Sequence, residues 1–181
     1  RRGERAWRVN IYSLPSSPSW APSATRIPRR NSDAAATTRR ISTLMKRSLS
    51  TTGPAHPGTR VTYGTAGFRA KADILDSTFF RMGVLAVLRS RAAGGLAVGL
   101  MVTASHNPEP DNGIKLVDTD GGMLHQSWEG FATRLANADE GELPAVLAAV
   151  AAETATAEAS GGVVVIGRDT RPHSEGLASI A

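Results

Sequence analysis

A serine, a histidine and a lysine near the middle of the chain have residue types and spacing that suit nucleophilic chemistry. Ser105 and His106 stand in a segment of strong structure breakers, residues 103–113, that includes two prolines. Lys115 follows on a short apolar run, from which its amine can reach the same pocket. A serine hydroxyl beside a base is the arrangement of covalent catalysis. The alternative is a tight turn whose Asn-Pro and Asn-Gly pairs serve geometry alone.

A second loop, residues 167–172, carries arginines suited to an anion. Arg168 and Arg171 flank Asp169 directly after the apolar run 163–166 and before an expected helix. Guanidinium groups beside a helix N-terminus favour phosphate. The alternative is a surface loop in which Asp169 pairs internally with an arginine. A third segment, residues 63–69, combines two glycines with Arg69 and indicates little by itself.

These loops stand between segments whose periodicity predicts alternating helices and strands. We expect helices over residues 78–92, 127–136 and 144–150 and from Ser174, with Asp76-Ser77 and Ser174 as caps. Strands are expected over residues 96–103, 114–117 and 163–166. This order predicts an α/β fold with a mostly parallel sheet and helices on both faces. In such sheets functional groups gather at the carboxyl ends of the strands.

Composition excludes several classes of protein. The 181 residues include no Cys, which excludes a disulfide framework, a thiolate metal site and a cysteine nucleophile. No run approaches the ~18 apolar residues that span a bilayer, so no membrane partner is expected.

Charge divides the chain in two. Residues 1–60 hold 12 of the 21 Lys and Arg but only two of the 16 Asp and Glu, Glu4 and Asp33. This Arg-, Ser- and Pro-rich leader has few large apolar residues, which predicts disorder. Three interpretations stay open: translated upstream sequence before Met45, an organelle-targeting leader, or an arm that binds nucleic acid. We favour the first, and therefore expect a cytoplasmic protein without a specific nucleic-acid partner.

Taken together, residues 63–69, 103–115 and 167–171 resemble three signatures of the α-D-phosphohexomutases, and the resemblance extends over residues 61–181. In most members the segment that corresponds to residues 167–171, which begins Gly-Arg-Asp, precedes the loop with the active-site serine, which corresponds to residues 103–115. Here it follows, as in the subgroup that acts on N-acetylglucosamine phosphates. The resemblance implies a phosphosugar substrate and interconversion of the 6-phosphate and the 1-phosphate, on the route to UDP-N-acetylglucosamine.

The same resemblance assigns roles to individual residues. Ser105 would be the phosphoserine, and its phosphate would be one ligand of Mg²⁺. Lys115 would be a general acid/base. His106 and Asn107 would shape the pocket around the phosphoserine. Arg69 and Arg171 would line the cleft and offset charge during phosphoryl transfer, whereas Arg168 and Asp169 would be structural.

The resemblance also predicts what this chain lacks. Members of the family have four domains around one cleft, and domains 2–4 carry the remaining metal ligands and the loops that select the sugar. We therefore expect residues 61–181 to form a first domain with negligible activity alone. One alternative is a mutase for glucose or mannose phosphates. The other is a non-catalytic fragment that binds through its basic arm.

Overall fold

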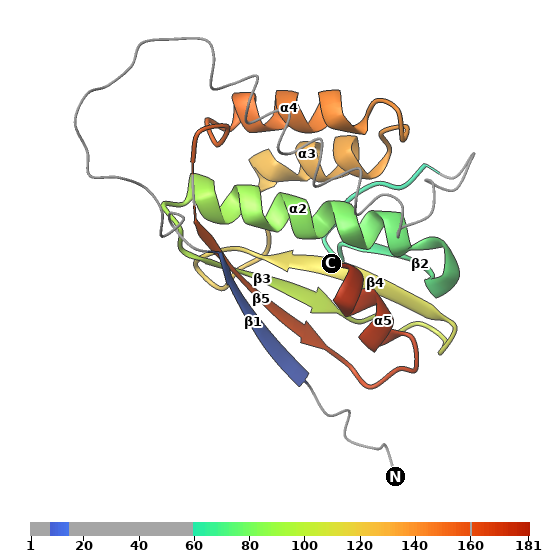
Figure 1. The fold of residues 1–181 in the computed structure, drawn as a ribbon. Coiled ribbons are helices and arrows are strands. Elements are labelled where there is room, and N and C mark those ends of the chain that lie inside the picture. Colours follow the sequence, from blue (N-terminus) through green and yellow to red (C-terminus); the bar gives the residue numbers. More distant parts are fainter. Residues whose placement is uncertain (1–7, 15–59, 160) are drawn as a thin grey trace, which may run out of the picture.

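The computed structural model describes residues 8–14, 60–159 and 161–181, which form one mixed α/β unit (Figure 1). Its strands are β1 (Arg8–Leu14), β2 (Phe68–Lys71), β3 (Ala97–Val102), β4 (Asp111–Val117) and β5 (Gly162–Arg168). Its helices are the 3-10 turn η1 (Ala72–Ile74), α2 (Asp76–Ala92), α3 (Gln126–Ala136), α4 (Leu143–Glu153) and α5 (Ser174–Ile180). The α/β class and the helix-strand order from residue 76 onward are as predicted.

The five strands form one sheet in the order β1-β5-β3-β4-β2. Only β3 and β5 run parallel, and the other three neighbouring pairs are antiparallel. The prediction of a mostly parallel sheet is therefore wrong. The physical reason lies in residues 103–110, because a connection of this length is too short for the crossover that parallel neighbours need. β4 must therefore return antiparallel to β3.

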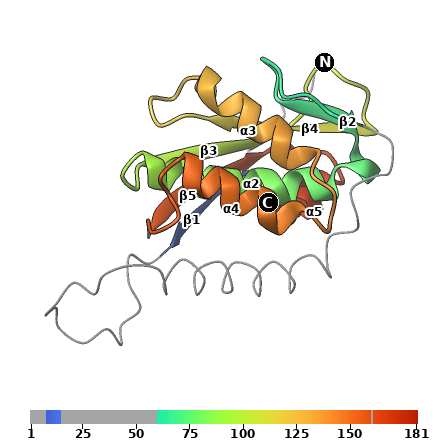
Figure 2. The ribbon, with the colours of Figure 1, turned by 90° about the horizontal axis from the view of Figure 1, so that it is seen from above.

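The helices described here lie on one face of the sheet, where α2 packs on the strands and α3 and α4 form an outer layer (Figures 1 and 2). α5 lies beside α2, since Val87, Val164 and Ala178 line one shared cavity. Along β3, Val98, Leu100 and Val102 are fully buried, whereas Gly99 and Met101 between them are partly exposed. The prediction of helices on both faces is therefore wrong for the described residues.

β1 corrects the prediction that the whole of residues 1–60 is disordered. Arg8–Leu14 pairs antiparallel with the full length of β5, from Arg8 opposite Arg168 to Leu14 opposite Gly162. Val9, Ile11 and Tyr12 are residue types that favour strands, and the edge of β5 supplies the hydrogen bonds that this short segment cannot make alone. The remainder of the predicted leader lies outside the described residues.

The predicted helix boundaries are nearly correct, but the predicted caps are wrong. α2 ends before Gly94 and Gly95, both with positive φ, as expected. Its N-cap is Leu75, which makes no side-chain capping bond. Ser174 opens α5 without capping it. No helix of the described ranges is long and apolar enough to cross a membrane.

The core lies between the sheet and α2. Its largest fully buried side chains come from β2 to β4, from the N-cap and the first ten residues of α2, and from the outer helices: Phe68, Leu75, Phe79, Met82, Leu85, Val98, Leu100, Val102, Ile114, Leu116, Leu135 and Leu143. This packing fixes the strand ends that carry the loops.

Candidate active site

Three segments meet at one end of the strands, where β3, β5 and β2 end and β4 begins. β3 and β5 run parallel and end together, with Val102 opposite Arg168. Lys71 at the end of β2 lies opposite Asp111 at the start of β4, so the same end also receives β2. The serine loop (residues 103–110) therefore lies beside residues 169–173, and the Asp169 amide donates to the Val102 carbonyl at 3.1 Å. This confirms the expectation that the two loops share this end of the strands.

Ser105 stands at the corner of a tight turn. The Asn107 amide donates to the Ala104 carbonyl at 2.9 Å, which leaves Ser105 and His106 at the two central positions of the turn. Both residues are exposed, whereas Ala104 is fully buried. The turn thus anchors the loop on one side of Ser105 and presents its hydroxyl to a ligand.

The side chain of Asn107 braces the loop from within. Its Nδ2 atom donates to Asp111 Oδ2 at 3.1 Å, and Lys71 Nζ lies 2.7 Å from Asp111 Oδ1. Hydrogen bonds from Lys71 and then Asn107, together with the charges of Lys71 and Arg171, lower the pKa of Asp111 although burial opposes this shift. The carboxylate therefore stays ionised and ties β2, the serine loop and β4 together.

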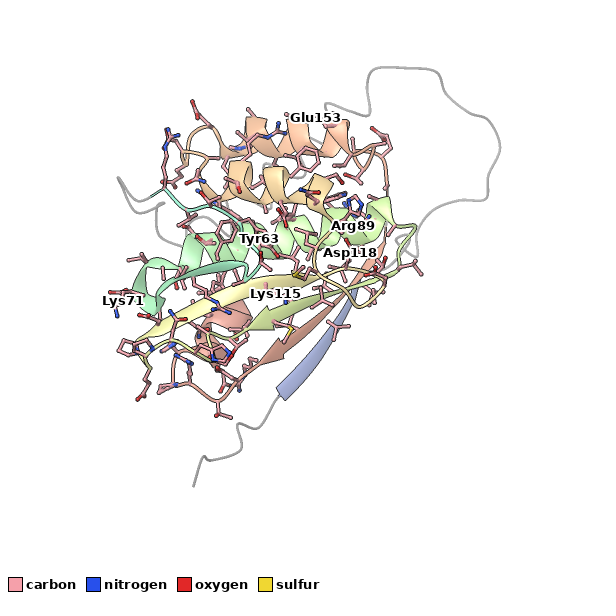
Figure 3. The ribbon with its side chains drawn as sticks, turned by 180° about the vertical axis from the view of Figure 1, so that it is seen from behind. Tyr63, Lys71, Arg89, Lys115, Asp118 and Glu153 are labelled. Atoms are coloured by element: carbon pink, nitrogen blue, oxygen red, sulfur yellow. The ribbon has the colours of Figure 1, made fainter. Side chains whose placement is uncertain are left out.

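Arg69 and Lys115 project from the same face of the sheet. Arg69 lies opposite Gly113, two residues before Lys115, and alternate residues of a strand share a face. Phe68, which precedes Arg69, pairs with Ile114, which precedes Lys115, and both of these side chains point into the core on the opposite face. Arg69 is exposed and Lys115 half-buried. Figure 3 shows Lys115 on β4, between Lys71 at one end of the sheet and Asp118 at the other.

Gly113 allows the serine loop to begin close to Arg69. A Cβ atom on this glycine would lie 2.6 Å from the Phe68 carbonyl oxygen, 2.9 Å from Arg69 Cγ and 3.1 Å from the Thr103 carbonyl oxygen. Only a residue without a side chain permits this approach. The structure therefore brings Arg69 beside the start of the serine loop, and its role in lining a cleft stays a prediction.

The remainder of the segment 63–69 is structural. The Leu116 amide donates to the Tyr63 hydroxyl at 2.9 Å, and the Tyr63 and Phe68 rings meet edge to face with centroids 5.2 Å apart. Gly67 has a φ of 72°, and a Cβ there would lie 2.2 Å from the Ile114 carbonyl oxygen. One of the two glycines thus serves close backbone approach, whereas Gly64 borders open space.

Ser105, His106 and Lys115 are not joined into a hydrogen-bonded triad. Within residues 60–159 and 161–181, none of these three side chains has a hydrogen-bond or ion-pair partner, although Lys115 lies opposite Met101 on the strand that leads to the serine loop. Their side chains are therefore available to a substrate. A site for phosphoryl transfer needs no preformed triad, because positioning and charge supply most of the catalysis.

Arg171 occupies a different place from the predicted one. Its side chain is 5% exposed and lies behind the serine loop. Its Nε donates to the Asp169 carboxylate. Its Nη1 donates to the carbonyl oxygens of Pro108 at 2.7 Å and Asp111 at 2.8 Å and, more weakly, to that of Glu109. Its Nη2 donates to the carbonyl oxygens of Ala104 and Asn107. Every N–H of the guanidinium is used. The expectation that Arg171 lines the cleft and binds phosphate is wrong, because the loop itself occupies its donors.

Asp169 has the structural role that was predicted for it. Its Oδ1 accepts from Ser174 Oγ at 2.6 Å, and its Oδ2 accepts from Thr103 Oγ1 at 2.9 Å and from Arg171 Nε at 3.2 Å. Burial alone would raise the pKa of Asp169, but these hydrogen bonds, the Arg171 amide and the Arg171 charge together lower it. Arg168 pairs with the exposed Glu175 at 2.9 Å and is also structural.

Sequence reasoning missed the buried polar residues that complete this network. Asn112 Nδ2 donates to Ser174 Oγ at 2.9 Å, and Thr103 joins the end of β3 to Asp169. Both Asn112 and Ser174 are fully buried. The available signal was Asn112 itself, because a buried amide within a strand must find partners.

The described residues do not make a complete metal site. No group of three or more His, Cys, Asp or Glu side chains in these ranges is arranged to hold an ion. Ser105 is exposed, so a phosphate on its hydroxyl could offer an oxygen to a hard cation. The chemistry of the predicted Mg²⁺ ligand therefore fits, although this part of the chain supplies only that one donor.

Comparisons with known proteins agree with this geometry. Residues 85–142 match the family model for phosphoglucomutase/phosphomannomutase, alpha/beta/alpha domain I. The chain is 60% identical over 116 residues to phosphoacetylglucosamine mutase of Sus scrofa, covering 64% of this chain and 21% of that protein. It is 47% identical over 130 residues to the Oryza sativa enzyme, covering 68% of this chain and 23% of that protein. The chain thus spans about a fifth of the length of these curated relatives.

Solved structures give the same result. An N-acetylglucosamine-phosphate mutase of the α-D-phosphohexomutase superfamily, in the apo form, superposes with a TM-score of 0.67 at 43% identity, covering 75% of this chain and 31% of that one. The Aspergillus fumigatus N-acetylphosphoglucosamine mutase in complex with GlcNAc-6P and magnesium gives 0.60 at 38% identity, covering 75% and 25%. The chain therefore belongs to the α-D-phosphohexomutase superfamily and carries its first domain.

Proposed function

We propose that this domain supplies the phosphoserine of a mutase that interconverts N-acetylglucosamine 6-phosphate and N-acetylglucosamine 1-phosphate. The observation that carries the proposal is the place of Ser105, exposed at the corner of a turn that a buried arginine holds from behind. The relatives' names and the GlcNAc-6P complex of the fungal enzyme support the choice of sugar.

The reaction balances as two phosphoryl transfers. The sugar 1-hydroxyl attacks the phosphorus on Ser105, the P–O bond to the serine breaks, and a sugar 1,6-bisphosphate forms. The Ser105 hydroxyl then attacks the 6-phosphate, which releases the 6-hydroxyl and restores the phosphoserine. Lys115 would exchange the proton of each attacking or leaving oxygen, and Arg69 would offset charge on the transferred group.

The bound metal is expected to be Mg²⁺, which would withdraw charge from the phosphate. Within the described residues it would be held by an oxygen of the Ser105 phosphate. His106 flanks Ser105 at the corner of the turn and would form one wall of the pocket. Since the chain spans about a fifth of its relatives, we expect turnover from the full-length protein and negligible turnover from these 181 residues alone.

Turnover of N-acetylglucosamine 6-phosphate by the full-length protein, compared with its Ser105→Ala variant, tests the proposal. We expect turnover that the variant abolishes, and incorporation of one phosphate on Ser105 after incubation with glucose 1,6-bisphosphate, measured by mass spectrometry. Ser179→Ala is the matched control, because Ser179 is exposed on α5 and its hydroxyl bonds only to the helix. Unchanged turnover in Ser105→Ala would refute the proposal, and faster turnover of glucose or mannose phosphates would reassign the sugar.

A further inference from the structure

The carbonyl groups of the serine loop converge on a single buried cation. The guanidinium of Arg171 donates hydrogen bonds to the carbonyl oxygens of Ala104, Asn107, Pro108 and Asp111. Residues on both sides of Ser105 are therefore bound to one rigid, planar group. A guanidinium presents its donors in a fixed fork, whereas an ammonium would act as a point charge. The loop is therefore shaped around the guanidinium.

This arrangement fixes the direction of the peptide that leads into Ser105. No cis peptide occurs in the described chain, and in a planar trans peptide the N–H points opposite to the C=O. Because the Ala104 carbonyl points at Arg171, the Ser105 N–H points away from it, to the outer side of the loop. The same holds for the Pro108 carbonyl and the Glu109 N–H.

The outward amide of Ser105 has no hydrogen-bond partner within residues 60–159 and 161–181. An N–H donor that faces solvent beside an exposed hydroxyl is suited to an anionic oxygen on that hydroxyl. The inward carbonyls, by contrast, would repel a phosphate if they faced it. At the Ala104–Ser105 and Pro108–Glu109 peptides, Arg171 thus holds the carbonyl oxygen on the inner side of the loop and leaves the N–H on the outer side.

Asp169 holds the guanidinium in this position. Its Oδ2 atom binds Arg171 Nε, and its two oxygens also bind Thr103 at the end of β3 and Ser174 at the start of α5. The carboxylate balances a charge that would otherwise be buried alone, which is costly. The serine loop is in this way tied to the sheet and to α5 through Asp169 and Arg171.

We propose that Arg171 is a positioning residue for phosphoryl transfer, which holds the loop so that the Ser105 N–H donates to the phosphoryl group on Ser105. The inference rests on the proposed function of Ser105, and it gives the buried arginine a role that does not require contact with the sugar. Substrate affinity and the chemical step should therefore respond differently to its replacement.

Steady-state kinetics of the full-length protein with Arg171→Lys and Arg171→Ala test this inference. We expect kcat to fall about 10²-fold while KM for N-acetylglucosamine 6-phosphate changes less than about twofold. Added guanidinium ion at tens of millimolar should restore part of the activity of Arg171→Ala and none to Ser105→Ala. Arg168→Lys is the control, because the side chain of Arg168 bonds to Glu175 and not to the serine loop.

A spectroscopic measurement separates positioning from general stability. With ¹⁵N-serine labelling, phosphorylation should move the Ser105 amide proton strongly downfield in the unsubstituted protein and much less in Arg171→Lys. If Arg171→Ala does not fold, Arg171→Lys with a melting temperature near that of the unsubstituted protein carries the test. Unchanged kcat in Arg171→Lys, or a rise in KM that matches the fall in kcat/KM, would overturn the inference. Activity in Ser105→Ala would instead overturn the proposed function.

Discussion

The Nη1 atom of Arg81 lies 2.6 Å from the carbonyl oxygen of Ala136, the last residue of α3, and 3.2 Å from that of Leu135. Arg81 belongs to α2 and is only 2% exposed. The last carbonyls of a helix lack partners within the helix and carry its partial negative charge. A buried cation from a neighbouring helix therefore caps α3 and ties the outer layer to the core.

Arg81→Ala should destabilise the protein by about 2–3 kcal/mol, because two helix-end carbonyls lose their donor in a buried site. Urea unfolding followed by circular dichroism measures this loss. Arg134→Ala serves as the comparison, since its ion pair with Glu153 at 2.8 Å is exposed and should contribute less than about 1 kcal/mol. An equal loss of unfolding free energy in the two variants would show that the bonds of Arg81 to the end of α3 do not stabilise the protein.

Acid should weaken the fold through Asp169. Its folded pKa lies below the ordinary value of 3.8, so its contribution is fully present above that value and disappears as the pH falls through the lower, folded pKa. The free energy of unfolding should decrease as the pH falls below the ordinary value, and Asp169→Asn should flatten that slope. Asp73→Asn, which removes an exposed carboxylate of η1, is the control for the loss of one negative charge. A slope that persists in Asp169→Asn would assign it to other carboxylates.

Gly67→Ala should lower the free energy of unfolding more than the same substitution at Gly94 or Gly64. At Gly67 a Cβ would strike the Ile114 carbonyl at 2.2 Å, and φ is 72°, so the loss should be about 3 kcal/mol or more. Gly94 has a φ of 70° but open space, which predicts a loss of about 1 kcal/mol. Gly64, with open space and no positive φ, should change stability by less than about 0.5 kcal/mol. Thermal or urea unfolding of the three variants checks this order.

On the proposed function, Lys115→Met should lower kcat of the full-length protein by about 10²- to 10⁴-fold, because the proton of the attacking hydroxyl would lose its acceptor. KM should change far less, and phosphate transfer from glucose 1,6-bisphosphate to Ser105 should slow in parallel. Lys71→Met removes a lysine that binds the carboxylate of Asp111 and tests whether loss of any nearby positive charge has the same effect. A comparable fall in both variants would contradict a specific proton-transfer role.

The sequence by itself predicted the α/β class, the helix positions and the two loops that the structure brings side by side at the ends of β3 and β5. Hydrophobic periodicity located α2 and α3, because a helix must bury one side whatever its neighbours are. The breakers of residues 103–113 located the serine loop, and its signature indicated the superfamily. β1 was missed, because the short run Arg8–Leu14 becomes a strand only where the edge of β5 pairs with it.

Only the tertiary structure decided which polar residues hold the site and which face a ligand. Arg69 and Arg171 have the same side chain in similar motif positions, yet one is exposed on β2 and the other is enclosed by loop carbonyls. Sequence spacing cannot distinguish them, because burial depends on how β3 and β5 bring two distant loops together. The residue types that define the chemistry are therefore local, whereas the partners that set their roles come from packing between segments about 60 residues apart in the chain.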